Sequence, residues 1–287
     1  MSSINEKRVY DDREGTNVCY LATDVGVVRV TVSDDLVGEY CVVRRGTARD
    51  VAVVDGQVVV ATDESVVDGG VTTGVGPALA VGTDARGGLL VVVADGTVQQ
   101  PGGPALGSVA DARAVAGGLV AAPDGVYRVG DEVSHAGLND VRDVTGAAGG
   151  TNGIGGATPL AATAAGLYAL GPGWSRRVEG AFVAVTGGPD GAVALGDGGR
   201  VFRSLVDETS GRQLDVWERL PPLPATVDPV DVGRGAGVTY VAGEGGRLAV
   251  RLDGGEWRTR LLGTPGVHRL IVGEPKGERG PAWSDRT

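Results

Sequence analysis

The chain has 287 residues, of which 51 are glycine, and it carries 36 acidic against 26 basic side chains. Its 42% hydrophobic content is enough for a buried core and excludes a disordered acidic chain. The net charge of −10 argues against nucleic acid as a general partner, because phosphate binding depends on clusters of Lys and Arg. No apolar run approaches the roughly 18 residues of a membrane span, and the first residues lack the apolar segment of a secretory signal. We therefore expect a cytoplasmic protein that binds neither membrane nor nucleic acid.

The cations are almost all arginine, since only Lys7 and Lys276 are lysines. In salt near 1 M, repulsion between surface carboxylates is screened within about 3 Å, so an acidic surface is tolerated there. An acid excess with almost no Lys is therefore typical of halophilic proteins from a salt-filled cytoplasm. The alternative is an acidic protein of a GC-rich genome, which also favours Arg, Gly, Ala and Val. Under both interpretations the charge describes the setting and identifies no ligand.

Short runs of Val, Ala and Leu, separated by Asp-Gly and Gly-Gly, predict strands joined by tight turns. In chain order, the first three strands are NVCYLATD, GVVRVTVSDD and VGEYCVVRRG. A unit of four runs then repeats, with the second run apolar on both sides and the fourth more polar. The first runs begin near residues 48, 77, 111, 141, 181, 229 and 267. A spacing of roughly 40 residues for four short strands is that of a propeller blade.

The two ends of the repeat predict a closed ring. The first unit lacks its first strand, and VHRLIVG at 267–273 is a strand without a unit of its own. A blade built from both would remove the exposed sheet edges. We therefore predict an all-β, seven-bladed β-propeller over residues 17–273, between an N-terminal extension (1–16) and a flexible C-terminal tail (274–287). Six or eight blades stay open, because the outer strands of the third blade are weakly patterned.

Cys19 and Cys41 fall on the second and fourth strands of the first unit. A strand lies between them, so their Cα atoms are too far apart for a disulfide, which needs about 4.4–6.8 Å. We expect two free, buried thiols, since Cys behaves as a small apolar residue.

The segment LDGGEWRTRLL, Leu252–Leu262, resembles the Asp-box turn of sialidase-like (BNR) propellers, where an Asp, a Gly and a Trp stabilise the hairpin between the third and fourth strands. VWERLPPLP and PGWSRRVEG are similar but weaker. From about residue 17 to 273 the chain also resembles a family of haloarchaeal seven-bladed propeller proteins. These resemblances imply a propeller of WD40-like or BNR-like repeats and a halophilic source, without an activity.

Sialidase chemistry would require three Arg for a carboxylate, a Tyr nucleophile helped by Glu, and an Asp acid. Arginines lie near the starts of first strands, where they could converge. The matching Tyr-Glu pair is not evident, because the tyrosines of second and third strands look like packing residues: Tyr20, Tyr127, Tyr168 and Tyr240. We expect no catalytic residues of this kind.

The starts of the first strands line the central channel, on the face where propellers usually bind ligands. Charged residues recur at comparable places there: Arg49, Asp50, Asp111, Arg113, Arg142, Asp143, Asp231, His268 and Arg269. They could hold an anionic ligand or a peptide carboxylate, which suits the bidentate fork of Arg. The alternative is that neighbouring blades exchange Arg–Asp pairs that hold the ring together. The choice depends on strand phase, because a slip of one residue turns each side chain to the other face.

Other site chemistries have little support. Two Cys and two His, far apart, do not make a zinc site. The Asp-Gly-Gly turns at Asp197 and Asp253 lack the spacing of a calcium loop and read as hairpin turns. The glycine run at 146–156 lacks the Lys and the following helix of a phosphate loop, so it reads as a loop or a lid. No Ser is placed beside His268 for a triad. We predict no metal and no cofactor.

Two segments depart from the blade pattern. Residues 203–226 extend the sixth blade and include PPLP, a stiff segment suited to docking. The tail carries a solitary Trp. Candidate partner-binding residues at the rim and tail are Trp217, Pro221, Pro222, Leu223 and Trp283. The alternatives are a long hairpin and a frayed end.

The sequence thus favours a monomeric, non-catalytic scaffold that binds a protein or peptide partner in a high-salt cytoplasm. The reason is that a ring of short strands presents its loops on a stiff frame, while the sequence shows no set of residues with the pattern of a catalytic site. The alternative is a hydrolase or lyase that acts on a small anionic or sugar substrate at the channel mouth.

Overall fold

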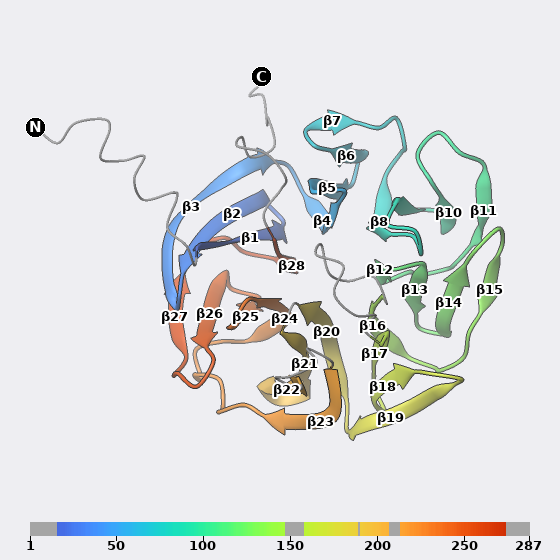
Figure 1. The fold of residues 1–287 in the computed structure, drawn as a ribbon. Helices are drawn as coiled ribbons and strands as arrows, with labels where there is room; N and C mark the ends of the chain where they lie inside the picture. Colours follow the sequence, from blue (N-terminus) through green and yellow to red (C-terminus); the bar gives the residue numbers. More distant parts are fainter. Residues whose placement is uncertain (1–15, 147–157, 189, 207–212, 274–287) are drawn as a thin grey trace, which may run out of the picture.

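The computed structural model describes residues 16–146, 158–188, 190–206 and 213–273. They form seven four-stranded antiparallel sheets placed around a central axis (Figure 1). Within these ranges, helical backbone is confined to a 3₁₀ turn, Asp197–Gly199. The fold is the predicted seven-bladed β-propeller.

Each blade runs from its first strand at the channel to its fourth at the rim. Blade 1 consists of β28 (Val267–Val272), β1 (Thr16–Thr23), β2 (Gly26–Ser33) and β3 (Leu36–Arg45). Blade 2 consists of β4 (Ala48–Val54), β5 (Gln57–Thr62), β6 (Val66–Asp68) and β7 (Val71–Thr72). Blade 3 consists of β8 (Ala78–Thr83), β9 (Leu89–Val93), β10 (Thr97–Gln99) and β11 (Ala105–Ser108). Blade 4 consists of β12 (Ala114–Ala116), β13 (Leu119–Ala122), β14 (Gly125–Val129) and β15 (Val133–His135).

The last three blades follow the same order. Blade 5 consists of β16 (Val141–Thr145), β17 (Leu160–Thr163), β18 (Gly166–Leu170) and β19 (Trp174–Glu179). Blade 6 consists of β20 (Phe182–Gly188), β21 (Gly191–Gly196), β22 (Arg200–Val206) and β23 (Gln213–Arg219). Blade 7 consists of β24 (Pro229–Gly235), β25 (Val238–Gly243), β26 (Arg247–Leu252) and β27 (Arg258–Leu261).

The ring closes through blade 1 as predicted. The C-terminal strand β28 pairs antiparallel with β1, with Leu270 opposite Leu21 and Val272 opposite Cys19. The weak pattern of the third blade has a simple origin, because β10 and β11 are only three and four residues long. The first strand of blade 4 begins at Ala114 rather than near 111, because Asp111 has a positive φ of 50° and turns the chain before the strand starts.

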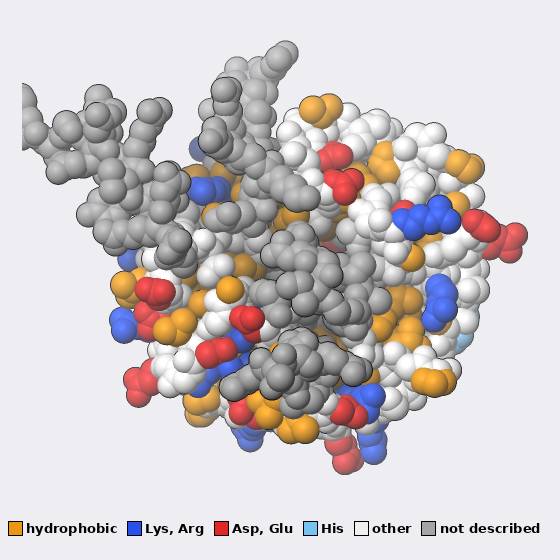
Figure 2. Space-filling model, in the orientation of Figure 1, with side chains coloured by type: hydrophobic (Ala, Val, Ile, Leu, Met, Phe, Trp, Pro, Cys, Tyr) orange, Lys and Arg blue, Asp and Glu red, His pale blue; other side chains and the backbone are white. Residues whose placement is uncertain are grey.

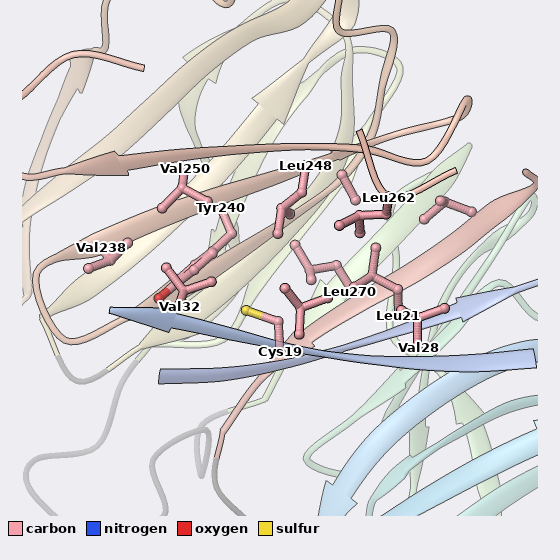
Figure 3. Packing of buried hydrophobic residues seen from close by; sticks show 13 residues of the cluster. Cys19, Leu21, Val28, Val32, Val238, Tyr240, Leu248, Val250, Leu262 and Leu270 are labelled. Carbon is pink, nitrogen blue, oxygen red and sulfur yellow. The ribbon is translucent and has the colours of Figure 1, made fainter. Parts of the chain in front are cut away.

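The core is divided among the blade interfaces. Seven clusters of buried apolar side chains each fill the space between two neighbouring blades. Second strands are buried along nearly their whole length, as in β13 and β25, because each has a blade on both sides. Figure 3 shows the cluster at the closure, where Cys19 and Leu21 of blade 1 face Tyr240 and Leu248 of blade 7.

Both cysteines are free, as predicted, but only Cys19 is buried. Cys41 is exposed, contrary to the prediction, because β3 is an outer strand with solvent over most of its length. In the described part of the chain, no helix is long and apolar enough to cross a membrane.

Candidate functional site at the channel mouth

The Arg-Asp dipeptides of the first strands are split between two environments. Register shifts lie between Ala48 and Asp50 and between Val141 and Asp143. The residue inside each shift is the arginine, so the bulge adds one residue and re-aims the side chains around it. The Asp lies one residue further on and is buried, whereas Arg49 is exposed and Arg142 partly so.

The registers place one residue of each first strand at the same level of the channel: Arg269, Asp50, Ala80, Ala114, Asp143, Ala184 and Asp231, from blade 1 to blade 7. We call these seven positions the channel ring. Three carboxylates and one guanidinium thus share a level with three small alanines. The sequence predicted the four charged members but not the level that they share.

Each channel-ring aspartate joins its own strand to the next blade. Asp50 accepts hydrogen bonds from the backbone N–H of Val51 and from that of Val81 in blade 3, both at 2.9 Å. Asp143 accepts from Val144 at 2.9 Å and from Val185 of blade 6 at 2.8 Å. These bonds satisfy the carboxylates and hold adjacent first strands at a fixed distance.

Asp231 makes the same link at the point of ring closure. Its carboxylate accepts from Val232 at 2.8 Å and from Leu270 of the C-terminal strand at 2.7 Å. The last strand of the chain is therefore fixed to blade 7 by a side chain as well as to β1 by its backbone.

Arg269 connects the three aspartates. Its Nη2 lies 2.9 Å from Asp143 Oδ1, and its Nε lies 3.5 Å from Asp50 Oδ1 and 3.9 Å from Asp231 Oδ2. Blade 5 lies across the ring from blade 1, so the guanidinium spans the channel. It is already bound by carboxylates of this chain, which leaves little capacity for an added anion.

Burial shifts the pKa values of three channel-ring side chains, Asp231, Asp50 and Arg269. Burial raises the pKa of Asp231 to about 7, against the lowering effect of Arg269, and Asp143 raises it further. Burial also raises the pKa of Asp50, again opposed by Arg269. For Arg269, burial alone lowers the pKa, but the carboxylates of Asp143, Asp231 and Asp50 outweigh it and the pKa is raised.

We expect the stability of the fold to fall as pH rises from 5 to 7. The folded pKa of Asp231 exceeds its ordinary 3.8, so the folded state binds more protons than the unfolded state in this window. Each unit of pKa corresponds to about 1.4 kcal/mol, which gives a loss of about 2–3 kcal/mol that levels off above pH 7.

The measurement is chemical denaturation of wild type and Asp231→Asn at pH 5, 6, 7 and 8 in one salt. The variant should show a flatter dependence, since Asn does not ionise. Asp228→Asn, at a nearby exposed position, is the matched control and should keep the wild-type slope. An unchanged slope in Asp231→Asn would contradict the assignment.

The other predicted basic residues of the mouth contact carboxylates at its edge. Arg113 contacts Asp140, and Arg142 contacts Asp197 of blade 6, both at 2.9 Å, and these pairs join neighbouring blades. Arg49 pairs with Asp63, and His268 lies 2.8 Å from Asp24, both within one blade. The exposed Asp111 belongs to the loop before blade 4. The pairs of Arg113 and Arg142 are thus of the kind expected if neighbouring blades exchange Arg–Asp pairs, whereas those of Arg49 and His268 are not.

Sequence reasoning missed a second ring, of acidic turns. The turn between the second and third strands lies at the mouth, because each second strand ends opposite the start of the first strand, as Thr62 does opposite Ala48. Six of the seven turns expose an acid: Asp24, Asp63, Asp95, Asp124, Asp197 and Glu244. The exception is Ala164-Ala165 of blade 5. The signal was present as an Asp or Glu following six of the seven apolar second runs.

Only some of the predicted rim residues are exposed and free to contact a partner. Trp217 packs against the core between blades 5 and 6, and Leu223 packs against the core between blades 6 and 7. Pro221 and Pro222 are exposed, and the carbonyl oxygen of Pro221 accepts a 2.9 Å hydrogen bond from Trp257 Nε1. The segment around Trp217 is the β22–β23 hairpin and the loop after it. Trp283 lies outside the described residues, as does most of the glycine run at 146–156.

No group of three His, Cys, Asp or Glu within the described ranges is arranged to hold a metal ion. Asp253 and Asp197 lie in tight turns between strands, and both are engaged by arginines.

A family model described as Beta-prop HVO_0234-like, beta propeller, matches residues 3–273. The chain belongs to this propeller family. No curated protein sequence matches it.

Solved structures share the fold at low identity. The computationally designed Ika8 protein is 12% identical with a TM-score of 0.52, over 93% of this chain and 96% of that chain. A putative 6-phosphogluconolactonase from Bacteroides fragilis is 11% identical with a TM-score of 0.53, over 91% and 99%. The WD40 domain of Pan2 from Neurospora crassa is 12% identical with a TM-score of 0.49, over 78% and 82%. At these identities the likeness to the two structures with TM-scores above 0.5 concerns the propeller fold alone.

Proposed function

We propose that this member of the family is a non-catalytic propeller scaffold that binds a protein or peptide partner in a high-salt cytoplasm. The partner presents basic side chains to the channel mouth. The exposed prolines of the blade 6 loop offer a second contact at the rim.

The charge distribution of the mouth carries this proposal. Arg49, Arg113, Arg142 and Arg269 are each neutralised by a carboxylate of the chain itself. Exposed acids at Asp95 and Glu244 have no ion pair among the described residues, so negative charge is what the mouth offers to a partner. A stiff ring of acidic turns suits Lys or Arg side chains of a partner, which can form ion pairs with these carboxylates at contact distance even where salt screens charge beyond about 3 Å.

Binding of a fluorescent Lys/Arg-rich peptide tests the proposal. We expect affinity that falls with salt and weakens several-fold in the double variant Asp95→Asn, Glu244→Gln. The matched control is Glu39→Gln with Glu132→Gln, two exposed acids at the rim and on the opposite face. Equal loss in both double variants, or no preference for the basic over an acidic peptide, would refute the proposed mouth.

A high-salt cytoplasm implies that the thermal stability of the fold depends on salt concentration. On transfer from about 2 M to 0.1 M KCl, where the Debye length reaches about 10 Å, repulsion among the surface acids increases. We expect the thermal midpoint to fall markedly in KCl and to recover when salt is restored. Calorimetry across this range is the measurement, and an unchanged midpoint would contradict a halophilic origin of the charge.

A hydrolase or lyase at the channel mouth is the second candidate, and the raised pKa of Asp231 is the observation that favours it. A carboxyl that stays protonated near neutral pH can act as a general acid. Screening for turnover of small anionic and sugar substrates, with Asp231→Asn as the inactive comparison, distinguishes this candidate from the scaffold.

A further inference from the structure

A polar layer separates blades 6 and 7 beyond their shared apolar core. Blade 6 contributes Arg203 and Glu218, which face each other across β22 and β23. Blade 7 contributes Arg234, Thr239 and Arg251. The apolar cluster of this interface includes Val201 and Val232, each two residues before one of these arginines, so the arginines face the same interface.

The three polar residues of blade 7 form one row across its sheet. Arg234 is paired with Thr239 across β24 and β25, and Thr239 is paired with Arg251 across β25 and β26. Directly paired residues project to the same side of a sheet. Arg234 Nη1 also donates to Thr239 Oγ1 at 3.1 Å. Two guanidinium groups therefore flank one hydroxyl inside the interface.

Asp253 neutralises two of the arginines of this layer. Arg234 donates to its two carboxylate oxygens at 2.9 and 2.7 Å, a bidentate pair, and Arg203 Nη1 approaches it at 2.6 Å. Arg203 also pairs with Glu218. The pKa of Asp253 is lowered because Arg234 and Arg203 outweigh its burial. Blade 6 makes room with Gly188, where a Cβ would lie 2.5 Å from Arg234 Cγ.

Arg251 is the arginine of this layer that has no carboxylate partner among the described residues. It is 6% exposed, and its Nε and Nη1 are buried without a hydrogen-bond partner among the described residues. Arg234 Nε is likewise buried and unpartnered. Among the described residues of this layer, three guanidinium groups thus face two carboxylates, Asp253 and Glu218. A buried guanidinium stays charged and its unsatisfied N–H groups are unfavourable, so the layer has the composition of a site that lacks one anion.

We propose that the layer between blades 6 and 7 binds a small oxyanion, with Arg251 as its main ligand and Arg203 and Arg234 as the flanking charges. Guanidinium forks match the paired oxygens of phosphate, sulfate or carboxylate. The layer opens to solvent at one end, where the side chains of Glu218 and Asp253 are 41% and 34% exposed. Figure 2 shows acidic and basic side chains close together near β26 on the face drawn there. The proposal is independent of the partner proposed for the channel mouth.

The experiment measures inorganic phosphate binding to the purified chain by isothermal titration, with sulfate and acetate as further arms. Chloride at matched ionic strength provides the baseline. We expect saturable binding to wild type, at least tenfold weaker binding to Arg251→Gln, and unchanged binding to Arg260→Gln, an exposed arginine of β27. Binding of acetate alone would identify the ligand as a carboxylate group, and binding of phosphate or sulfate as a tetrahedral anion.

Arg203→Lys keeps the charge but loses the fork, and it serves if Arg251→Gln does not fold. This variant should bind phosphate more weakly than wild type. Absence of saturable binding to wild type by all three anions would overturn the proposal. Equal affinities of wild type and the variant used, Arg251→Gln or Arg203→Lys, would also overturn it.

Discussion

Replacing Arg269 by Met should destabilise the fold by about 3–5 kcal/mol, the range for removing one partner of a buried ion pair. The variant leaves three buried carboxylates, Asp50, Asp143 and Asp231, without the one cation that contacts them all. Met keeps a long apolar stem in place of the arginine stem, so the loss reports the charge rather than an empty space. The change also acts at the strand that closes the ring.

Chemical denaturation of Arg269→Met, at a fixed high salt, gives the free energy of unfolding. Arg260→Met, whose guanidinium lies over the exposed Tyr40 ring at 5.9 Å, is the matched control and should change stability by less than about 1 kcal/mol. Equal losses for the two arginine variants would contradict the assignment of Arg269 as the central cation of the channel ring.

The strands and their grouping could be predicted from the sequence because their signals are local. A second strand, which lies between two neighbouring blades, must be apolar on both sides. The sequences of β5 and β25 are apolar along almost their whole length, and both strands are buried. The closing strand β28 could be predicted because the first unit lacked a partner for NVCYLATD. These conclusions need only the period of the pattern and the count of runs.

The channel ring could be predicted only in part, because a bulge changes strand phase without changing composition. The dipeptide sequence Arg142-Asp143 does not indicate which of the two residues is the inserted residue of the β-bulge. The register decides that Asp143 binds Val185 and Arg269, whereas Arg142 binds Asp197 at the edge. The two partners of Asp143 lie 42 and 126 residues away in sequence, beyond the reach of local patterns.

Asp253 shows a second limit of sequence reasoning. The Asp-box resemblance implies a role for Asp253 within its own hairpin, and Asp253 lies in the turn between β26 and β27. Its carboxylate instead binds Arg234 of the same blade and Arg203 of blade 6. Trp257 of the same segment packs on the core between these blades. The motif therefore contributes to the contact between blades, which a single hairpin pattern does not contain.

The second large effect is expected at a glycine of the channel. First strands of neighbouring blades approach each other closely toward their ends, and glycines lie at the contacts. A Cβ at Gly82 of β8 would lie 2.1 Å from the carbonyl oxygen of Val115 in β12, and one at Gly146 would lie 2.4 Å from Gly117 Cα. Both obstacles are backbone, which moves only if the whole blade moves. Part of the high glycine content therefore follows from the close approach of neighbouring first strands around the channel.

We therefore expect Gly82→Ala to destabilise the fold by about 2–3 kcal/mol, the upper part of the range for overpacking a tight interior. The matched control is Gly76→Ala in the loop before the same strand, where a Cβ would meet nothing within 4 Å. That change should be neutral or stabilise by up to about 1 kcal/mol, because Ala restricts the unfolded chain. Both free energies of unfolding come from denaturation under identical conditions. A Gly82→Ala variant as stable as Gly76→Ala would mean that blades 3 and 4 separate easily, and the first strands could not then be the rigid frame that positions the channel ring.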